Sequence, residues 1–153
     1  MNVTLQLDRE PVQFDLSGAV AGVSVSIRRL NPMALTAAQT AVQQTMSNSE
    51  ELLIVLARNR LLPEGGETVW RSLPETDLEA YLEAMVGISN WLSAVELGVR
   101  ALSDWAGFHD DQGKAHPMTR LVIEAAMLIP DFQEQVLARI DECLAVRLRG
   151  AAQ

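Results

Sequence analysis

The chain has 153 residues, which suits one domain, and 48% of them are apolar, which is enough for a core and argues against wholesale disorder. Its net charge is −8, from 20 acids and 12 bases, which disfavours nucleic acid as a partner because phosphate binding needs a basic surface. The single cysteine, the lack of a signal-peptide pattern and the lack of an apolar run near roughly 18 residues predict a cytoplasmic protein outside the membrane.

The first thirty residues carry the alternation that is typical of β-strands. Apolar residues occupy every second position in three short runs, over 3–7, 12–16 and 23–27. We predict an antiparallel three-stranded meander over residues 1–30. So small a sheet is marginal alone, so it should pack on the helices that follow.

Residues 31–153 are predicted to form a helical body, within one folding unit. Asn31 can cap a first helix and Pro32 suits its first turn; this helix should end near Ser47. The spacing of Ser47 and Glu50 predicts the start of a second, strongly apolar helix. That helix should end at Pro63, and residues 64–71 are expected to be a linker.

The third predicted helix starts at Ser72 or near Asp77, two alternatives that the spacing leaves open, and runs to about residue 103. It carries one stripe of large apolar residues and a second stripe of small ones with Trp91 in its middle, which predicts a central helix with neighbours on both sides. A polar connection over 104–116 follows.

Pro117 should open the last helix, with a break or kink at Pro130, arginines in its last turn and its end at Gly150. The predicted fold class is therefore α+β, mostly helical with about four helices, and with a small N-terminal antiparallel sheet.

Chemistry-bearing side chains gather at one place only. His109, Asp110, Asp111 and His116 lie in a turn that contains glycine, but a zinc site needs three or four ligands in fixed geometry, and a solvated turn explains them more simply. The sequence has no nucleophile elbow and no phosphate-binding loop. We expect no enzyme, cofactor or metal; a small metal-dependent enzyme using His109 and His116 is the third hypothesis.

The segment from Arg100 to Ile140 carries a family resemblance. Four short motifs follow one another in it: Asp104-Trp105-Ala106-Gly107, Asp110-Asp111-Gln112-Gly113, Pro117-Met118-Thr119 and Pro130-Asp131-Phe132. This layout resembles that of the tail assembly chaperones of tailed phages, and the strands running into residues 28–32 also look like that family.

The resemblance implies a non-catalytic chaperone that holds the helical tape measure protein, aids polymerisation of the tail tube protein, and acts in the host cytoplasm. The alternative is a structural tail or head–tail connector protein of a phage or phage-like particle. A homo-oligomer is left open. The candidate residues for partner contact or for a structural corner are Trp91, Trp105, Gly107, Phe108, Gly113, Pro117 and Phe132. We favour the corner, because Trp105 can plug the seam between the third and last helices and the glycines permit positive φ.

Overall fold

The computed structural model describes residues 3–7, 10–144 and 146–150. Its α+β, mostly helical character confirms the predicted fold class. The strands are β1 (Val3–Leu7), β2 (Val12–Asp15), β3 (Ser24–Ile27), β4 (Leu102–Ala106) and β5 (Val146–Gly150). The helices are the 3₁₀ helix η1 (Gly18–Val20), then α1 (Pro32–Ser47), α2 (Ser49–Arg58), α3 (Glu67–Thr76), α4 (Leu78–Ala101), α5 (Arg120–Ala126) and α6 (Pro130–Glu142).

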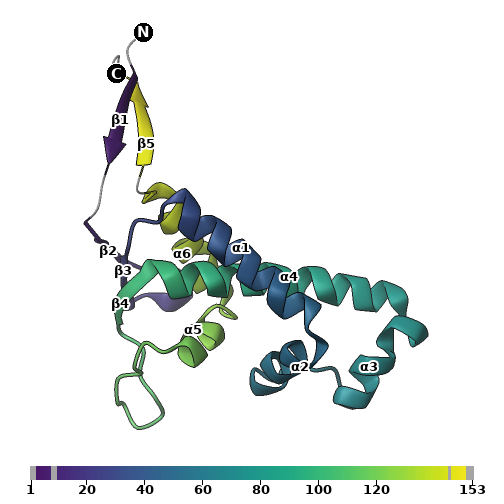
Figure 1. Ribbon diagram of the computed structural model, residues 1–153. Helices are drawn as coiled ribbons and strands as arrows, with labels where there is room; N and C mark the ends of the chain where they lie inside the picture. Colours follow the sequence, from purple (N-terminus) through teal and green to yellow (C-terminus); the bar gives the residue numbers. More distant parts are fainter. Residues whose placement is uncertain (1–2, 8–9, 145, 151–153) are drawn as a thin grey trace.

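The three-stranded antiparallel sheet has the order β2-β3-β4, so its third strand comes from the middle of the chain. The prediction that all three strands lie in residues 1–30 is wrong at β1, which pairs with β5 in a separate ribbon that projects from the body (Figure 1). The boundary expected at residue 30 therefore does not separate the sheet from the helices. Alternation predicts a strand but not its partner, and the five residues of β4 do not alternate.

The described residues hold six α-helices, and the prediction of about four is wrong because α3 begins in the expected linker and the expected last helix is divided. Residues 64–71 are not a plain linker, since α3 begins at Glu67. Asp77 then accepts a hydrogen bond from the backbone N–H of Ala80 (3.1 Å) and caps α4, so one helix ends and the next begins at this residue.

The predicted last helix is also divided. Pro117 lies before the helix, and Thr119 caps α5 by accepting from the backbone N–H of Val122 (3.4 Å). Of the break or kink predicted at Pro130, the structure has the break, since Pro130 opens α6. Residues 146–150 form β5 instead of a last helical turn ending at Gly150, because pairing with β1 supplies their backbone hydrogen bonds.

The first two helices follow the sequence closely. The Asn31 side chain accepts from the backbone N–H of Ala34 (2.8 Å), Pro32 lies in the first turn, and α1 ends at Ser47 as predicted. The cap of α2 is Asn48, which accepts from the backbone N–H of Glu51 (3.1 Å), and not the predicted Ser47.

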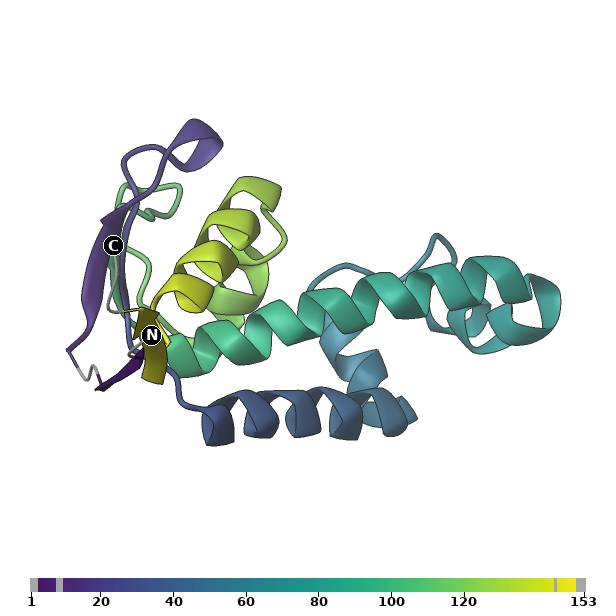
Figure 2. The ribbon, with the colours of Figure 1, turned by 90° about the horizontal axis from the view of Figure 1, so that it is seen from above.

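Helix α4 is the axis of the molecule (Figure 2). It contacts α1, α3, α5 and α6, which agrees with the two packing faces predicted for it. Gly98 provides the space for α5, since a Cβ there would lie 2.6 Å from Cε of Met127. No helix of the described chain has the length and apolar character to cross a membrane. The most deeply buried core side chains include Ile27, Leu56, Leu92, Val95, Met127, Phe132 and Val136.

Candidate functional site

The predicted corner is a packed aromatic cluster. Trp105, in β4, is only 8% exposed and its ring centroid lies 4.9 Å from that of Phe108 and 6.2 Å from that of Phe132. The indole Nε1–H donates to the carbonyl of His116 (3.2 Å), which ties the strand to the loop before α5. The structure thus brings three of the predicted residues together between the sheet and α6.

The glycines of the corner serve backbone geometry. Gly107 has φ +102°, and a Cβ there would lie 2.8 Å from Cα of Val23. Only glycine therefore allows the chain to leave β4 so close to the backbone of Val23. Gly113 has φ +78° in an open turn. Pro117 is exposed in the loop before α5. A role of these residues in partner contact stays a prediction.

The turn with the two histidines is organised by Asp110. Its Oδ1 accepts from the backbone N–H groups of Gln112 and Lys114, both at 2.9 Å, and His109 pairs with Ala115 in an isolated β-bridge. Across the described residues, no three His, Cys, Asp or Glu side chains are grouped so as to hold a metal ion. These contacts are those of a hydrogen-bonded turn.

Trp91 lies apart from this corner, in the middle of α4. It is 5% exposed, and its Nε1–H donates to the carbonyl of Glu124 in α5 (3.1 Å). Its ring forms part of the wall of an apolar groove beside α4, which the sequence did not reveal.

This groove, which we call the α3–α4 groove, has a volume of about 350 Å³. A Cβ at Gly87 would meet no atom within 4 Å, so the floor is open there. The α2–α3 linker, which bounds one side, runs along α4 on the side away from α1 (Figure 2). The lining residues are Leu61, Pro63, Trp70, Leu73, Ala84, Gly87, Ile88, Trp91 and Leu128.

An exposed apolar stripe continues the groove along α5. Leu121 and Leu128 are 58% and 40% exposed, and Ala125 between them is also exposed. Their spacing of four and three residues places them on one side of the helical segment. Because Leu128 also lines the groove, groove and stripe form one continuous apolar surface.

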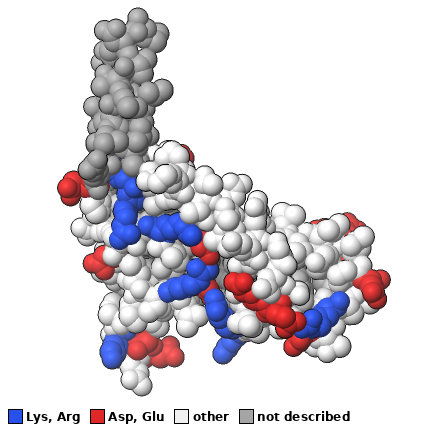
Figure 3. Space-filling model, viewed as in Figure 1, with Lys and Arg blue, Asp and Glu red and all other residues white. Residues whose placement is uncertain are grey.

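The lobe around the groove is acidic. Residues 61–90 hold six acids and one base, Arg71, which is bound to Glu50 and Glu67 at 2.8 Å. Glu64, Glu79 and Glu83 form no ion pair with any described residue. In Figure 3, acidic side chains appear over the α2–α3 end of the visible face, whereas most basic ones lie toward the other end.

A buried ion-pair chain fixes α5 against α2 and α4. Glu124, which is fully buried, accepts from Arg58 Nε (2.8 Å), Asn59 Nδ2 (2.9 Å) and Arg120 Nε (3.2 Å). Arg120 also donates to Glu96 (2.5 Å), and Glu96 accepts a further hydrogen bond from Arg100 (2.6 Å).

The arginines of this chain keep the two buried carboxyl groups in the charged form. Burial raises the pKa of Glu96 and of Glu124, but the hydrogen bonds from Arg120 and Arg100 to Glu96, and from Arg58 and Asn59 to Glu124, outweigh it, so both pKa values lie below the ordinary one. Both groups are therefore charged at neutral pH. The sequence signal was the spacing of four residues in Glu96–Arg100 and Arg120–Glu124.

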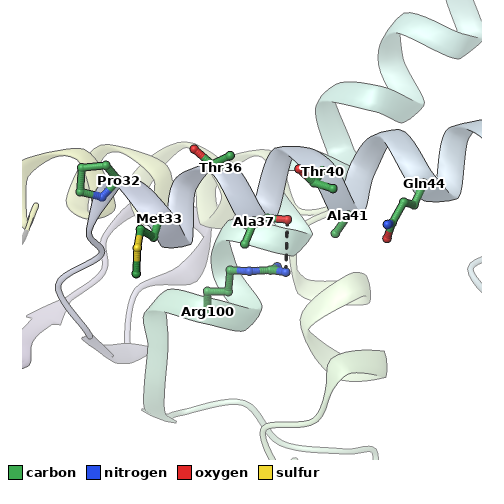
Figure 4. Close-up of a pocket in the computed structure, with 8 residues that line it drawn as sticks. All are labelled: Pro32, Met33, Thr36, Ala37, Thr40, Ala41, Gln44 and Arg100. Carbon is green, nitrogen blue, oxygen red and sulfur yellow. Dashed lines mark hydrogen bonds between the residues drawn. The ribbon is translucent and has the colours of Figure 1, made fainter.

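A larger but shallower hollow of about 580 Å³ lies along α1 (Figure 4). Seven of its eight lining residues come from α1 itself, and Arg100 of α4 reaches the Ala37 carbonyl at 3.5 Å. The lining alternates threonine and glutamine with small residues and includes no aromatic ring. The α3–α4 groove, with two tryptophans and an open glycine, is the better candidate site.

Sequence reasoning missed most of the groove. Trp91 was singled out, but Trp70 fell in the expected linker, and Ile88 and Leu128 were assigned to the apolar stripes of the third and last predicted helices. Comparison of the chain with protein-family models, with curated proteins and with solved structures gave no match.

Proposed function

We propose that this protein is a non-catalytic binding protein that holds a helical segment of another protein in the α3–α4 groove. The resemblance around Trp105 and Phe132 identifies the partner we propose, the tape measure protein of a phage tail. In that role the chain is a tail assembly chaperone of the host cytoplasm, with the tail tube protein as second partner.

The continuity of groove and stripe is the observation that supports this proposal. An amphipathic helix binds by seating side chains at i, i+3, i+4 and i+7 in an apolar groove. Here two buried indoles form walls, Gly87 leaves space at the floor, and Leu128 leads onto Leu121. Large exposed apolar patches rimmed by polar residues are typical of protein interaction sites.

Co-expression with the tape measure protein of the same gene cluster tests this function. We expect the soluble yield of that long helical protein to rise and the two chains to co-purify. No rescue together with no co-purification would contradict the proposal. Recovery of the protein in purified particles would favour the alternative, a structural tail or head–tail connector component.

A further inference from the structure

We infer that the segment held in the α3–α4 groove is a cationic amphipathic helix, with its apolar side against the groove and lysines or arginines on its flanks. This inference rests on the proposed function of the groove and adds the chemistry of the partner. It follows from the acids around an otherwise apolar surface.

The first step concerns where the charge lies. Glu83 directly precedes Ala84, which lines the groove, and Glu79 stands one helical turn before Glu83 along α4. Glu64 follows Pro63, which lines the other side. None of the three forms an ion pair with a described residue, so each can pair with a partner's cation.

The second step argues against a second copy of this chain that would enter the groove with the exposed apolar stripe of its α4. The exposed apolar side chains of the outer side of α4 are Leu78, Leu82 and Val86, with 56%, 54% and 63% exposure. Glu79 and Glu83 interleave with them in the sequence, so a second copy docking by this stripe would bring one acidic lobe against another. Like charges across an interface disfavour association, whereas complementary charges speed it and set its specificity.

The test uses two synthetic helices of about 18 residues, or five turns. They share one leucine side and differ only in carrying lysine or glutamate elsewhere; binding to the purified full chain is followed by fluorescence anisotropy. We expect the lysine peptide to bind about 10-fold or more tighter at about 50 mM salt, since three exposed ion pairs supply that ratio. The preference should largely disappear at about 500 mM salt, where the screening length is a few ångströms.

Charge reversal locates the effect. The pair Glu79→Lys and Glu83→Lys should lose the preference for the lysine peptide, whereas Glu134→Lys and Asp141→Lys on exposed positions of α6 change the net charge equally and should retain it. Equal loss in both double variants would overturn the inference, because net charge alone would then explain the preference.

Two further outcomes separate this inference from the proposed function. If both peptides bind the wild-type chain equally and Ile88→Glu, with an unchanged circular dichroism spectrum, abolishes both, the groove holds helices and the inference about charge is wrong. If neither peptide binds, the inference is wrong as well, while the co-expression experiment still decides the proposed function independently.

Discussion

Single side chains decide the corner under β4. Trp105 packs against Phe108 and Phe132, and its indole N–H donates a hydrogen bond to the His116 carbonyl. We expect Trp105→Ala to lower the free energy of unfolding by about 3–5 kcal/mol in a urea melt, because the two flanking rings cannot fill the cavity that loss of the indole would leave. Trp105→Phe, which loses the hydrogen bond but keeps most of the volume, is the control. A change below about 1 kcal/mol in the alanine variant would contradict this packing.

Two glycines of the same loop form a matched pair. Both have positive φ, but only at Gly107 would a Cβ meet backbone atoms; at Gly113 it would meet nothing within 4 Å. Gly113→Ala should cost about 1–2 kcal/mol for its left-handed backbone, and Gly107→Ala clearly more. Thermal melts of the two variants compare them directly, and equal costs would show that Gly107 is not confined by Val23.

The buried carboxylates predict a dependence of stability on pH. Since the folded-state pKa values of Glu96 and Glu124 lie below the ordinary value of about 4.3, their contribution is complete above that pH and is lost as pH falls through the folded-state values. Urea melts of the wild type between pH 7 and pH 3 should show this loss.

Glu124→Gln isolates the effect. It should cost about 2 kcal/mol at neutral pH, toward the lower end for a buried pair because Arg58 and Arg120 are 34% and 41% exposed. Its difference from wild type should shrink on acidification. Glu142→Gln, which removes an exposed pair with Arg139, is the control and should cost less than about 1 kcal/mol. A constant difference across the pH range would rule out Glu124 as a charged group.

For single residues, the sequence indicated which side chains have a special structural role better than it indicated which residues they contact. Trp105, Gly107 and Gly113 were recognisable because few residue types can fill a large apolar space with an N–H donor or adopt a positive φ without strain. Glu96 and Glu124 were not singled out from the sequence, because the partners Arg58 and Arg120 are distant in the chain from Glu124 and Glu96, respectively. Their role depends on the packing of α2, α4 and α5, which no local pattern encodes.

Helices were predictable where a cap and a proline coincide, as at Asn31-Pro32. Of the two alternative starts predicted for the third helix, the one near Asp77 is the start of α4, whereas Ser72 lies inside α3, which begins at Glu67 in the expected linker. Strands β4 and β5 were missed because their partners, β3 and β1, lie far away in the sequence and supply the hydrogen bonds that favour strand over helix.

The boundary between α3 and α4 depends on one carboxylate. Asp77→Ala removes the cap of α4 and should lower the free energy of unfolding by about 1 kcal/mol, whereas Asp77→Asn should be close to neutral, because asparagine caps equally well. Urea melts measure both. An alanine variant as stable as the wild type would mean that the break between the helices is set by packing alone.

For the whole molecule, the distribution of charge and exposed apolar surface bears on function more than the total charge does. Acidic side chains are concentrated in residues 61–90, which supply most of the lining of the apolar groove. The buried arginine–glutamate chain holds α5, and with it the stripe ending at Leu128, against α4. The overall acidity was evident from composition. The groove was not, because it forms where the α2–α3 linker, α3, α4 and the end of α5 converge.

The most direct test of the central claim is co-purification of the tape measure protein with two variants that differ only in place. Ile88→Glu puts a charge in the α3–α4 groove, and Met33→Glu puts the same charge on the exposed surface of α1, where Met33 is 78% exposed. We predict that Ile88→Glu reduces the recovered partner at least about 10-fold, the effect of a desolvated charge at a binding hot spot, while Met33→Glu leaves it unchanged. Equal recovery with both variants, each folded by circular dichroism, would contradict the claim that this groove holds the partner.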